Sequence, residues 1–227
     1  MRKAALIVGA GSGISASFAR VLTEAGYGVA LASRSAGGRA DGIGAALKLE
    51  CDATDPESVT RMFSRLDAEF PPLDVALYNP SYRTSGALTE LEPEQVRRSL
   101  DVTAFGAFLV AQQAARRMLA RGGGCILFTG ASASVKGYAR SAPFAMGKFA
   151  LRGLAQSMAR ELAPQNIHVA HFVIDGAVRG AGQPEPAGQP ESLLDPDAIA
   201  RTYLHVVQQP RSAWTWEVEL RPWVEKF

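Results

Sequence analysis

The sequence AALIVGAGSGISASFARVLTEA, residues 4–25, decides the fold of this chain. It opens with five consecutive apolar residues, continues with Gly9, Gly11 and Gly13, and then places apolar side chains at helical spacing. This order predicts a buried strand, a tight turn and an amphipathic helix. The first N–H groups of such a helix have no intrahelical partners, and they point along the positive end of the helix dipole. The turn is therefore a candidate site for an anionic group.

Three interpretations of the glycine-rich turn are open at this point: an ordinary tight turn, a P-loop and a dinucleotide-binding turn. A P-loop requires Gly-Lys-Ser or Gly-Lys-Thr after the turn, and neither follows here. A dinucleotide-binding turn requires glycine because a side chain would obstruct the close approach of a pyrophosphate. The dinucleotide interpretation leads, and its candidate residues are Gly9, Gly11, Ser12, Gly13 and Ile14.

The composition predicts one globular domain over residues 1–227. Hydrophobic residues make up 47% of the chain, and 24 basic against 22 acidic side chains give a net charge of +2 without a long block of one sign. We therefore expect no nucleic-acid surface. The apolar run near the start is too short for a signal peptide, and no segment is long enough to span a membrane. Cys51 and Cys125 lack metal-site spacing and are typical of free thiols, which favours a cytoplasmic location.

The residues after a second predicted strand, Gly28 to Ala32, bear on the choice of cofactor. In a dinucleotide fold, an acid at this strand end accepts hydrogen bonds from the adenosine ribose, whereas a basic side chain accommodates a 2′-phosphate. No acid occurs over residues 28–40, while Ser33 is followed by Arg34, and Arg39 lies nearby. This favours NADP(H) over NAD(H) and disfavours a methyltransferase. The alternative is that both arginines are solvated loop charges.

Strands and helices alternate over the rest of the chain. The predicted strands are 45–51, 73–78, 125–129, 167–174 and 214–220. Asp55 and Pro56 are typical of a helix N-cap and first helical residue, and further helices are predicted at 93–121, at 143–162 and before Pro210. This alternation predicts an α/β fold of the Rossmann type, a doubly wound sheet of about seven parallel strands with helices on both faces.

Three further patterns carry expectations. The apolar side of the 93–121 helix is predicted to hold Val96, Leu100, Phe105, Phe108, Leu109 and Met118. His168 and His171 lie three apart on a strand, hence on opposite faces, so we expect no shared metal site. Residues 176–191 are rich in Gly, Pro, Ala and Gln and follow a central strand, so we expect a mobile lid over a ligand site, with a plain disordered excursion as the alternative.

The chain resembles the short-chain dehydrogenase/reductase family over nearly its whole length. The resemblance rests on positions that match the motifs of that family near the cofactor. The TGxxxGxG turn of the family corresponds here to Gly9, Gly13 and Ser15, and the aspartate near the adenine corresponds to Asp52, which precedes Ala53. The NNAG motif corresponds to Tyr78, Asn79, Pro80 and Ser81. A Pro-Gly pair of the family is replaced by Asp175 and Gly176. The departures are Val8 for Thr, Ser15 for the last Gly, and the loss of one Asn.

The resemblance also implies a reaction. Enzymes of the family transfer a hydride between nicotinamide and a carbonyl or alcohol carbon, and a tyrosine transfers the proton. A lysine lowers the pKa of that tyrosine and binds the nicotinamide ribose. A serine forms a hydrogen bond with the substrate oxygen. Here Phe144 stands at the tyrosine position and Lys148 at the lysine position. Ala131 takes the serine position, beside Ser132, and Thr103 takes the place of a helix asparagine. Lys148 is therefore interpreted as a cofactor ligand.

Two hypotheses follow, because phenylalanine has no proton to transfer and positioned acid–base catalysis contributes about 10²- to 10⁴-fold. The first is an NADP-dependent oxidoreductase for a small carbonyl or alcohol substrate, with catalysis weakened or rerouted through Tyr138 or Ser132. The alternative is an inactive NADP(H)-binding pseudoenzyme with a regulatory role. A structural part in a heteromeric assembly is a third, weaker hypothesis. Helix pairing in the family implies a homodimer or homotetramer.

Overall fold

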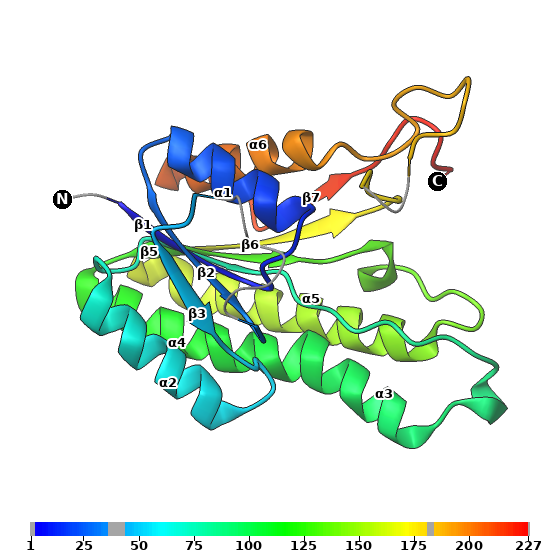
Figure 1. The fold of residues 1–227 in the computed structure, drawn as a ribbon, viewed down its shortest axis with the longest axis horizontal. Coiled ribbons are helices and arrows are strands. Elements are labelled where there is room, and N and C mark those ends of the chain that lie inside the picture. Colours follow the sequence, from blue (N-terminus) through cyan, green and yellow to red (C-terminus); the bar gives the residue numbers. More distant parts are fainter. Residues whose placement is uncertain (1–2, 36–43, 181–183, 227) are drawn as a thin grey trace.

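A twisted parallel sheet forms the centre of the molecule (Figure 1). The computed structural model describes residues 3–35, 44–180 and 184–226, and within them seven strands follow the order β3-β2-β1-β4-β5-β6-β7. The strands are β1 Ala4–Val8, β2 Gly28–Ser33, β3 Leu47–Glu50, β4 Val75–Tyr78, β5 Gly124–Thr129, β6 Ile167–Ile174 and β7 Glu217–Leu220. Every neighbouring pair is parallel. The predicted Rossmann-type α/β fold is confirmed.

Helices cover both faces of the sheet. In Figure 1, α1 and α6 lie above it, while α2, α4 and α5 lie below it, with α3 continuing into α4. The helices are α1 Ile14–Glu24, α2 Pro56–Glu69, α3 Pro93–Leu100, α4 Gly106–Arg121, α5 Ala142–Leu162 and α6 Pro196–Val207. Asp55 caps α2 as predicted, because its carboxylate accepts a hydrogen bond from the Glu57 N–H at 2.9 Å.

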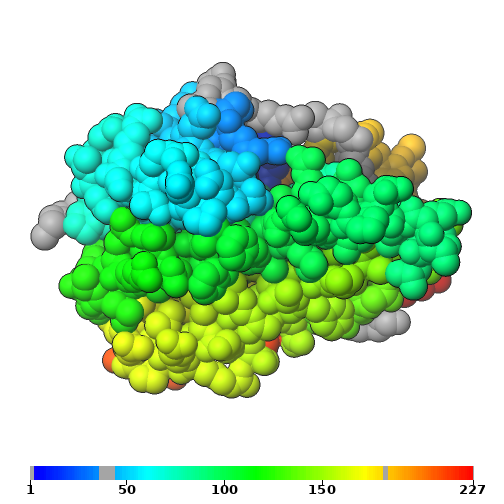
Figure 2. Space-filling model, turned by 90° about the horizontal axis from the view of Figure 1, so that it is seen from below, coloured from blue at the N-terminus to red at the C-terminus, as the bar shows by residue number. Residues whose placement is uncertain are grey.

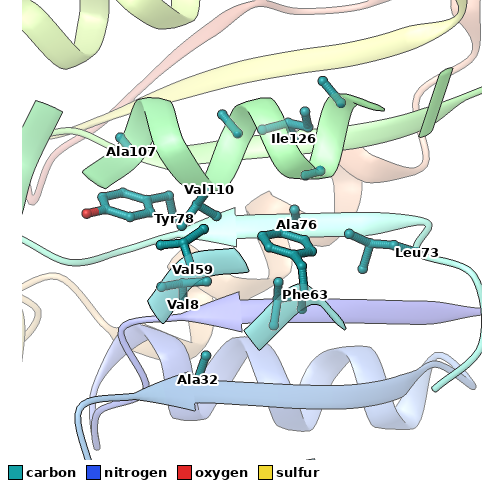
Figure 3. Close-up of a cluster of buried hydrophobic side chains, with 14 of the residues drawn as sticks. Val8, Ala32, Val59, Phe63, Leu73, Ala76, Tyr78, Ala107, Val110 and Ile126 are labelled. Atoms are coloured by element: carbon teal, nitrogen blue, oxygen red, sulfur yellow. The ribbon is translucent and has the colours of Figure 1, made fainter. Parts of the chain in front are cut away.

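Two apolar cores follow from this layering, one on each face of the sheet. Figure 3 shows part of the lower core, in which Phe63 and Val59 of α2 pack under β1 and β4. The upper core joins α1 and α6 through the rings of Phe18 and Tyr203, whose centroids lie 5.4 Å apart. Both faces of the central strands are therefore buried, which explains why these strands read as unbroken apolar runs.

The 93–121 region differs from its prediction in one respect. It is helical throughout, but a π-helical turn, Asp101–Phe105, separates α3 from α4. A π turn inserts an extra residue, so the face that points to the core shifts around the axis. Phe105 and Phe108, which were predicted on the apolar side of this helix, do not face the core and are exposed. The core side of α4 consists mainly of small residues, with Ala107, Val110, Ala111, Ala114, Ala115 and Met118 buried.

The predicted boundaries of three strands are corrected, whereas the last helix ends before Pro210 as predicted. The strand predicted at 45–51 is shorter, Leu47–Glu50, and that at 73–78 begins at Val75. The strand predicted at 214–220 begins only at Glu217, because the Thr215 N–H donates to the side chain of Gln209 at 2.8 Å instead of joining the sheet. The last helix ends at Val207, before Pro210.

The segment after β6 is attached at its start to the entrance of α6. The Arg179 N–H donates to the Leu194 carbonyl at 2.9 Å, and the Arg179 guanidinium pairs with Asp195 at 2.8 Å. Residues 181–183 lie outside the described part, so the lid stays a prediction. Arg39 also lies outside it. In the described ranges, no helix combines the length and the apolar character that crossing a membrane demands.

Candidate functional site

A cavity of about 480 Å³ opens at the carboxyl ends of β1, β2, β3 and β4. The strand order reverses between β1 and β4, and such a switch point is where open α/β sheets bind ligands. The predicted site residues that line the cavity are Gly9, Ser33, Arg34, Asp52, Ala53, Asn79 and Pro80. Seven candidates from four separate chain segments are thus brought together.

The glycine-rich turn fits a closely approaching ligand. Gly9 has φ +89°, and a Cβ there would lie 2.8 Å from the Pro80 ring, so only glycine is accommodated. A Cβ at Gly11 or Gly13 would meet no atom within 4 Å, which leaves open space beside the turn. Gly13 is the N-cap of α1 and makes no side-chain capping hydrogen bond, so the first N–H groups of this helix, near Ser12 and Ile14, remain available to an anion.

Ser15, which replaces a glycine of the family motif, joins the turn to β4. Its hydroxyl donates to the Gly9 carbonyl at 2.9 Å and accepts from the Asn79 side-chain amide at 2.8 Å. Ser15 is buried, so both hydrogen bonds are protected from water. The substitution therefore adds a connection between the two central strands at the ligand edge.

Asp52 is held as a carboxylate inside the cavity. Its Oδ1 accepts hydrogen bonds from the Thr54 N–H at 2.9 Å and from the Thr54 hydroxyl at 2.8 Å. The backbone hydrogen bond from Thr54 is the main cause of a lowered Asp52 pKa, and the positive charges of Arg34 and Arg98 contribute to it. Neither arginine forms a salt bridge with a described residue.

Arg98 was not singled out in the sequence, yet it lines the same cavity as Arg34. It belongs to α3, and its guanidinium lies 4.8 Å from the centroid of the Tyr82 ring. Nothing in the local sequence marks it, because it is one of several charged residues on an exposed helix. The packing of α3 against the loop that follows β4 brings Arg98 to the cavity.

The wall between this cavity and α4 is tightly packed. The buried Tyr78 hydroxyl donates to the Val102 carbonyl at 2.5 Å within the π-helical turn, and burial raises the pKa of Tyr78. A Cβ on Gly106 would lie 2.5 Å from the Tyr78 hydroxyl and 2.8 Å from the Ala53 carbonyl. Gly106 therefore allows the helix to approach the segment that carries Asp52.

Phe144 and Lys148 occupy the start of α5, away from the cavity. Lys148 is 2% exposed, and its Nζ donates to the Thr129 carbonyl at 2.7 Å. Burial lowers the pKa of Lys148 to about 7. The Phe144 ring is half-buried, with its centroid 5.8 Å from Lys148 Nζ and 5.4 Å from the guanidinium carbon of Arg83. The ring thus has two basic side chains beside it.

The candidate hydroxyl groups differ in their surroundings. Ser134 is buried, and its Oγ accepts from the Ala131 N–H at 3.1 Å. Ser132 begins the same short turn, is half-buried, and within the described chain its hydroxyl has no hydrogen-bond partner. Tyr138 is exposed, and among the described residues its phenol is likewise unpartnered. Ser132 and Tyr138 therefore remain free to bind a substrate oxygen.

Asp175, which follows β6, is buried between two cations. Its Oδ2 lies 3.2 Å from Lys136 Nζ and 3.4 Å from an Arg221 nitrogen.

The side chains of His168 and His171 do not approach a common point. His168 stacks on Trp214, while His171 Nδ1 lies 3.1 Å from Glu217. No cluster of potential metal ligands occurs in residues 3–35, 44–180 and 184–226.

Comparisons with known proteins agree with this architecture. A family model described as short chain dehydrogenase matches residues 3–183. The 3-oxoacyl-(acyl-carrier-protein) reductase MabA of Mycobacterium tuberculosis is 30% identical over 176 residues, covering 78% of this chain and 69% of the relative. Trans-4-hydroxycyclohexanecarboxylate dehydrogenase of Sinomonas cyclohexanicum is 33% identical over 190 residues, covering 78% and 73%. A short-chain dehydrogenase crystal structure from Rhodopseudomonas palustris is 35% identical, covers 98% of this chain and 100% of that one, and has a TM-score of 0.83.

Proposed function

The chain belongs to the short-chain dehydrogenase family, and we propose from this premise that it is an NADP(H)-dependent oxidoreductase acting on a small carbonyl or alcohol substrate. It is an oxidoreductase of the short-chain type, and members of this family use a nicotinamide cofactor. The observation that carries the preference for NADP(H) is the cavity in which Arg34 and Arg98 flank Asp52 without forming a salt bridge to any residue that the structure describes.

The residues present fit such a cofactor. Only glycine is accommodated at position 9, and the N-terminus of α1 has free N–H groups for a pyrophosphate. Arg34 and Arg98 would bind the 2′-phosphate end, and Asp52 would accept a hydrogen bond from the adenine amine. Lys148 would anchor the nicotinamide ribose, since it lies at the ligand edge of β5.

The nicotinamide group, when bound, supplies the hydride. This chain must then provide the proton for the substrate oxygen, and Phe144, at the proposed tyrosine position, has none. The Ser132 hydroxyl has no hydrogen-bond partner among the described residues and is a candidate to bind that oxygen, but it is a weak acid. Tyr138 is the second candidate. We therefore expect slow turnover by comparison with a site that has a positioned acid, which contributes about 10²- to 10⁴-fold.

A second candidate function is supported by the surroundings of Phe144. Its ring lies near the Arg83 guanidinium and the Lys148 amino group, and a guanidinium on an aromatic face is a favourable contact that requires no catalytic role. A pseudoenzyme that binds NADP(H) and regulates a partner would retain the cavity and lose turnover. The two functions share the cofactor and differ in rate.

Cofactor choice is tested by binding, without any turnover. NADPH and NADH are titrated into the protein, and cofactor fluorescence gives the two dissociation constants. We expect NADPH to bind at least about 10-fold more tightly, because hydrogen bonds to charged groups contribute about 1.5–3 kcal/mol each. Arg34→Ala and Arg98→Ala should each reduce the NADPH affinity while leaving NADH unchanged. Equal affinity of the wild type for both cofactors would contradict the proposal.

Turnover separates the enzyme from the pseudoenzyme. A panel of ketones, aldehydes and 4-hydroxycyclohexanecarboxylates is assayed with the wild type, Phe144→Tyr and Tyr138→Phe. A slow wild type that gains about 100-fold or more in kcat in Phe144→Tyr identifies an enzyme that lacks a proton donor. Loss of activity in Tyr138→Phe identifies the substitute donor. A wild type without turnover of any substrate supports the pseudoenzyme.

The proposal includes assembly and location. Exposed apolar side chains on α4 and α5 support a homodimer or homotetramer formed through these helices.

Both cysteines are free and buried, and burial raises the pKa of Cys51 to about 11, so these thiols are unreactive structural groups. Their free state is in keeping with a cytoplasmic location.

A further inference from the structure

The Arg83 guanidinium has no acidic partner among the described residues. It is exposed, and in the ranges that the structure describes its guanidinium makes neither a salt bridge nor a hydrogen bond. Its contact is the face of the Phe144 ring, 5.4 Å from the guanidinium carbon to the ring centroid. A guanidinium stacked on an aromatic ring keeps its N–H donors directed outward, where they can bind an anion.

The position of Arg83 is fixed by the fold. Ser99 is fully buried, and its Oγ lies 3.0 Å from the Tyr82 carbonyl and 3.1 Å from the Pro143 carbonyl. One hydroxyl thus joins the residue before Arg83 to the residue before Phe144. The same two loops are joined again where the Gly86 N–H donates to the Arg140 carbonyl at 2.9 Å. The ring and the guanidinium are therefore held together from both sides.

We propose that Arg83 binds the carboxylate of a small carbonyl substrate, so that the enzyme acts on short oxo acids or the corresponding hydroxy acids. This inference rests on the proposed function, because the reacting carbonyl lies beside Phe144 only if Phe144 occupies the tyrosine position. The distance from ring to guanidinium then places the carboxylate a few bonds from the carbonyl carbon. The planar fork of an arginine matches a carboxylate through two parallel hydrogen bonds.

The test compares ligands that differ only in charge. The protein saturated with NADP⁺ is titrated calorimetrically with pyruvate, levulinate and the primary amide of each acid. Wild type, Arg83→Met and Arg140→Gln are compared, since Arg140 is an exposed arginine of the neighbouring loop without an assigned role. We expect at least one oxo acid to bind about 10- to 100-fold more tightly than its amide in the wild type and in Arg140→Gln, and this preference to vanish in Arg83→Met.

Three results would overturn the inference: neither oxo acid binds, the amides bind as tightly as the acids, or Arg83→Met retains the preference. Turnover adds a further check, because a similar fall in kcat for acid and amide in Arg83→Met would place Arg83 on the carbonyl oxygen instead. Failure of the proposed function itself is recognised separately. It shows as absent NADPH binding or as absent turnover of neutral ketones, neither of which depends on Arg83.

Discussion

At the scale of single residues, burial sets the chemistry of this site more than residue type does. Lys148 is a lysine whose surroundings favour its neutral form, because burial lowers its pKa from 10.5 to about 7. Its Nζ still makes one hydrogen bond, to the Thr129 carbonyl. A bound ribose would add further partners. The free protein therefore carries a destabilising group at this position, as ligand sites often do.

Lys148 predicts how stability depends on pH. The unfolded state holds the proton up to about pH 10.5 and the folded state only to about pH 7, so between these values the unfolded state binds more protons and stability rises with pH. We expect a gain of roughly 1 kcal/mol per pH unit between pH 7 and pH 8.5, measured by urea unfolding. At higher pH, the raised pKa of Cys51 and Cys125 acts in the opposite direction.

The matched variants are Lys148→Met and Lys226→Met. Lys148→Met should be more stable than the wild type at pH 7 and should lose the slope, whereas Lys226→Met, which changes an exposed lysine, should keep it. An unchanged slope in Lys148→Met would show that Lys148 is charged in the folded protein.

At the scale of elements, the π-helical turn between α3 and α4 connects the core to the ligand cavity. The Tyr78 hydroxyl reaches the Val102 carbonyl in this turn, and Val102 itself lines the cavity. Gly106 follows the turn and lies against the Ala53 carbonyl. Helix, strand and the segment after β3 thus meet at one point, where there is no room for a larger residue.

Gly106→Ala tests this junction. The added Cβ would lie 2.5 Å from the Tyr78 hydroxyl, so we expect destabilisation by about 1–3 kcal/mol or more, although alanine is the better helix former. NADPH affinity should fall as well, because Ala53 lines the cavity. Gly153→Ala on the exposed side of α5 is the control; its Cβ would meet nothing within 4 Å, and it should stabilise by roughly 0.5–1 kcal/mol. Urea unfolding and cofactor titration provide the measurements, and equal stability of the two variants would refute the packing argument.

At the scale of the whole molecule, the outer side of the lower layer carries several exposed apolar side chains. Figure 2 views this layer, in which α2, α4 and α5 lie side by side. The π-helical turn, α4 and α5 expose Phe105 by 45%, Phe108 by 41%, Met146 by 48% and Phe149 by 45%. Phe105 and Phe108 also stack on each other, with centroids 6.4 Å apart. Large apolar side chains gathered on two helices indicate a surface that another copy covers.

We therefore expect light scattering to report a dimer or tetramer. A double substitution, Phe108→Arg with Phe149→Arg, should shift the protein toward the monomer, because two charges would have to be buried without partners. The control is Leu88→Arg, which changes an exposed apolar residue outside these helices. A wild type that is monomeric at all concentrations would contradict this prediction.

The sequence by itself determined the sheet, the glycine-rich turn and seven residues of the cavity, because these depend on local patterns: apolar runs, glycines at a turn, and polar residues at strand ends. It also identified Asp55 as a helix cap. Tertiary structure alone decided the rest. The packing of α3 and of the loop after β4 brings Arg98 into the cavity and Arg83 onto the Phe144 ring. The outward direction of Phe105 and Phe108 depends on a π turn that shifts the helix face. Such features arise from contacts between distant segments, which no local pattern encodes.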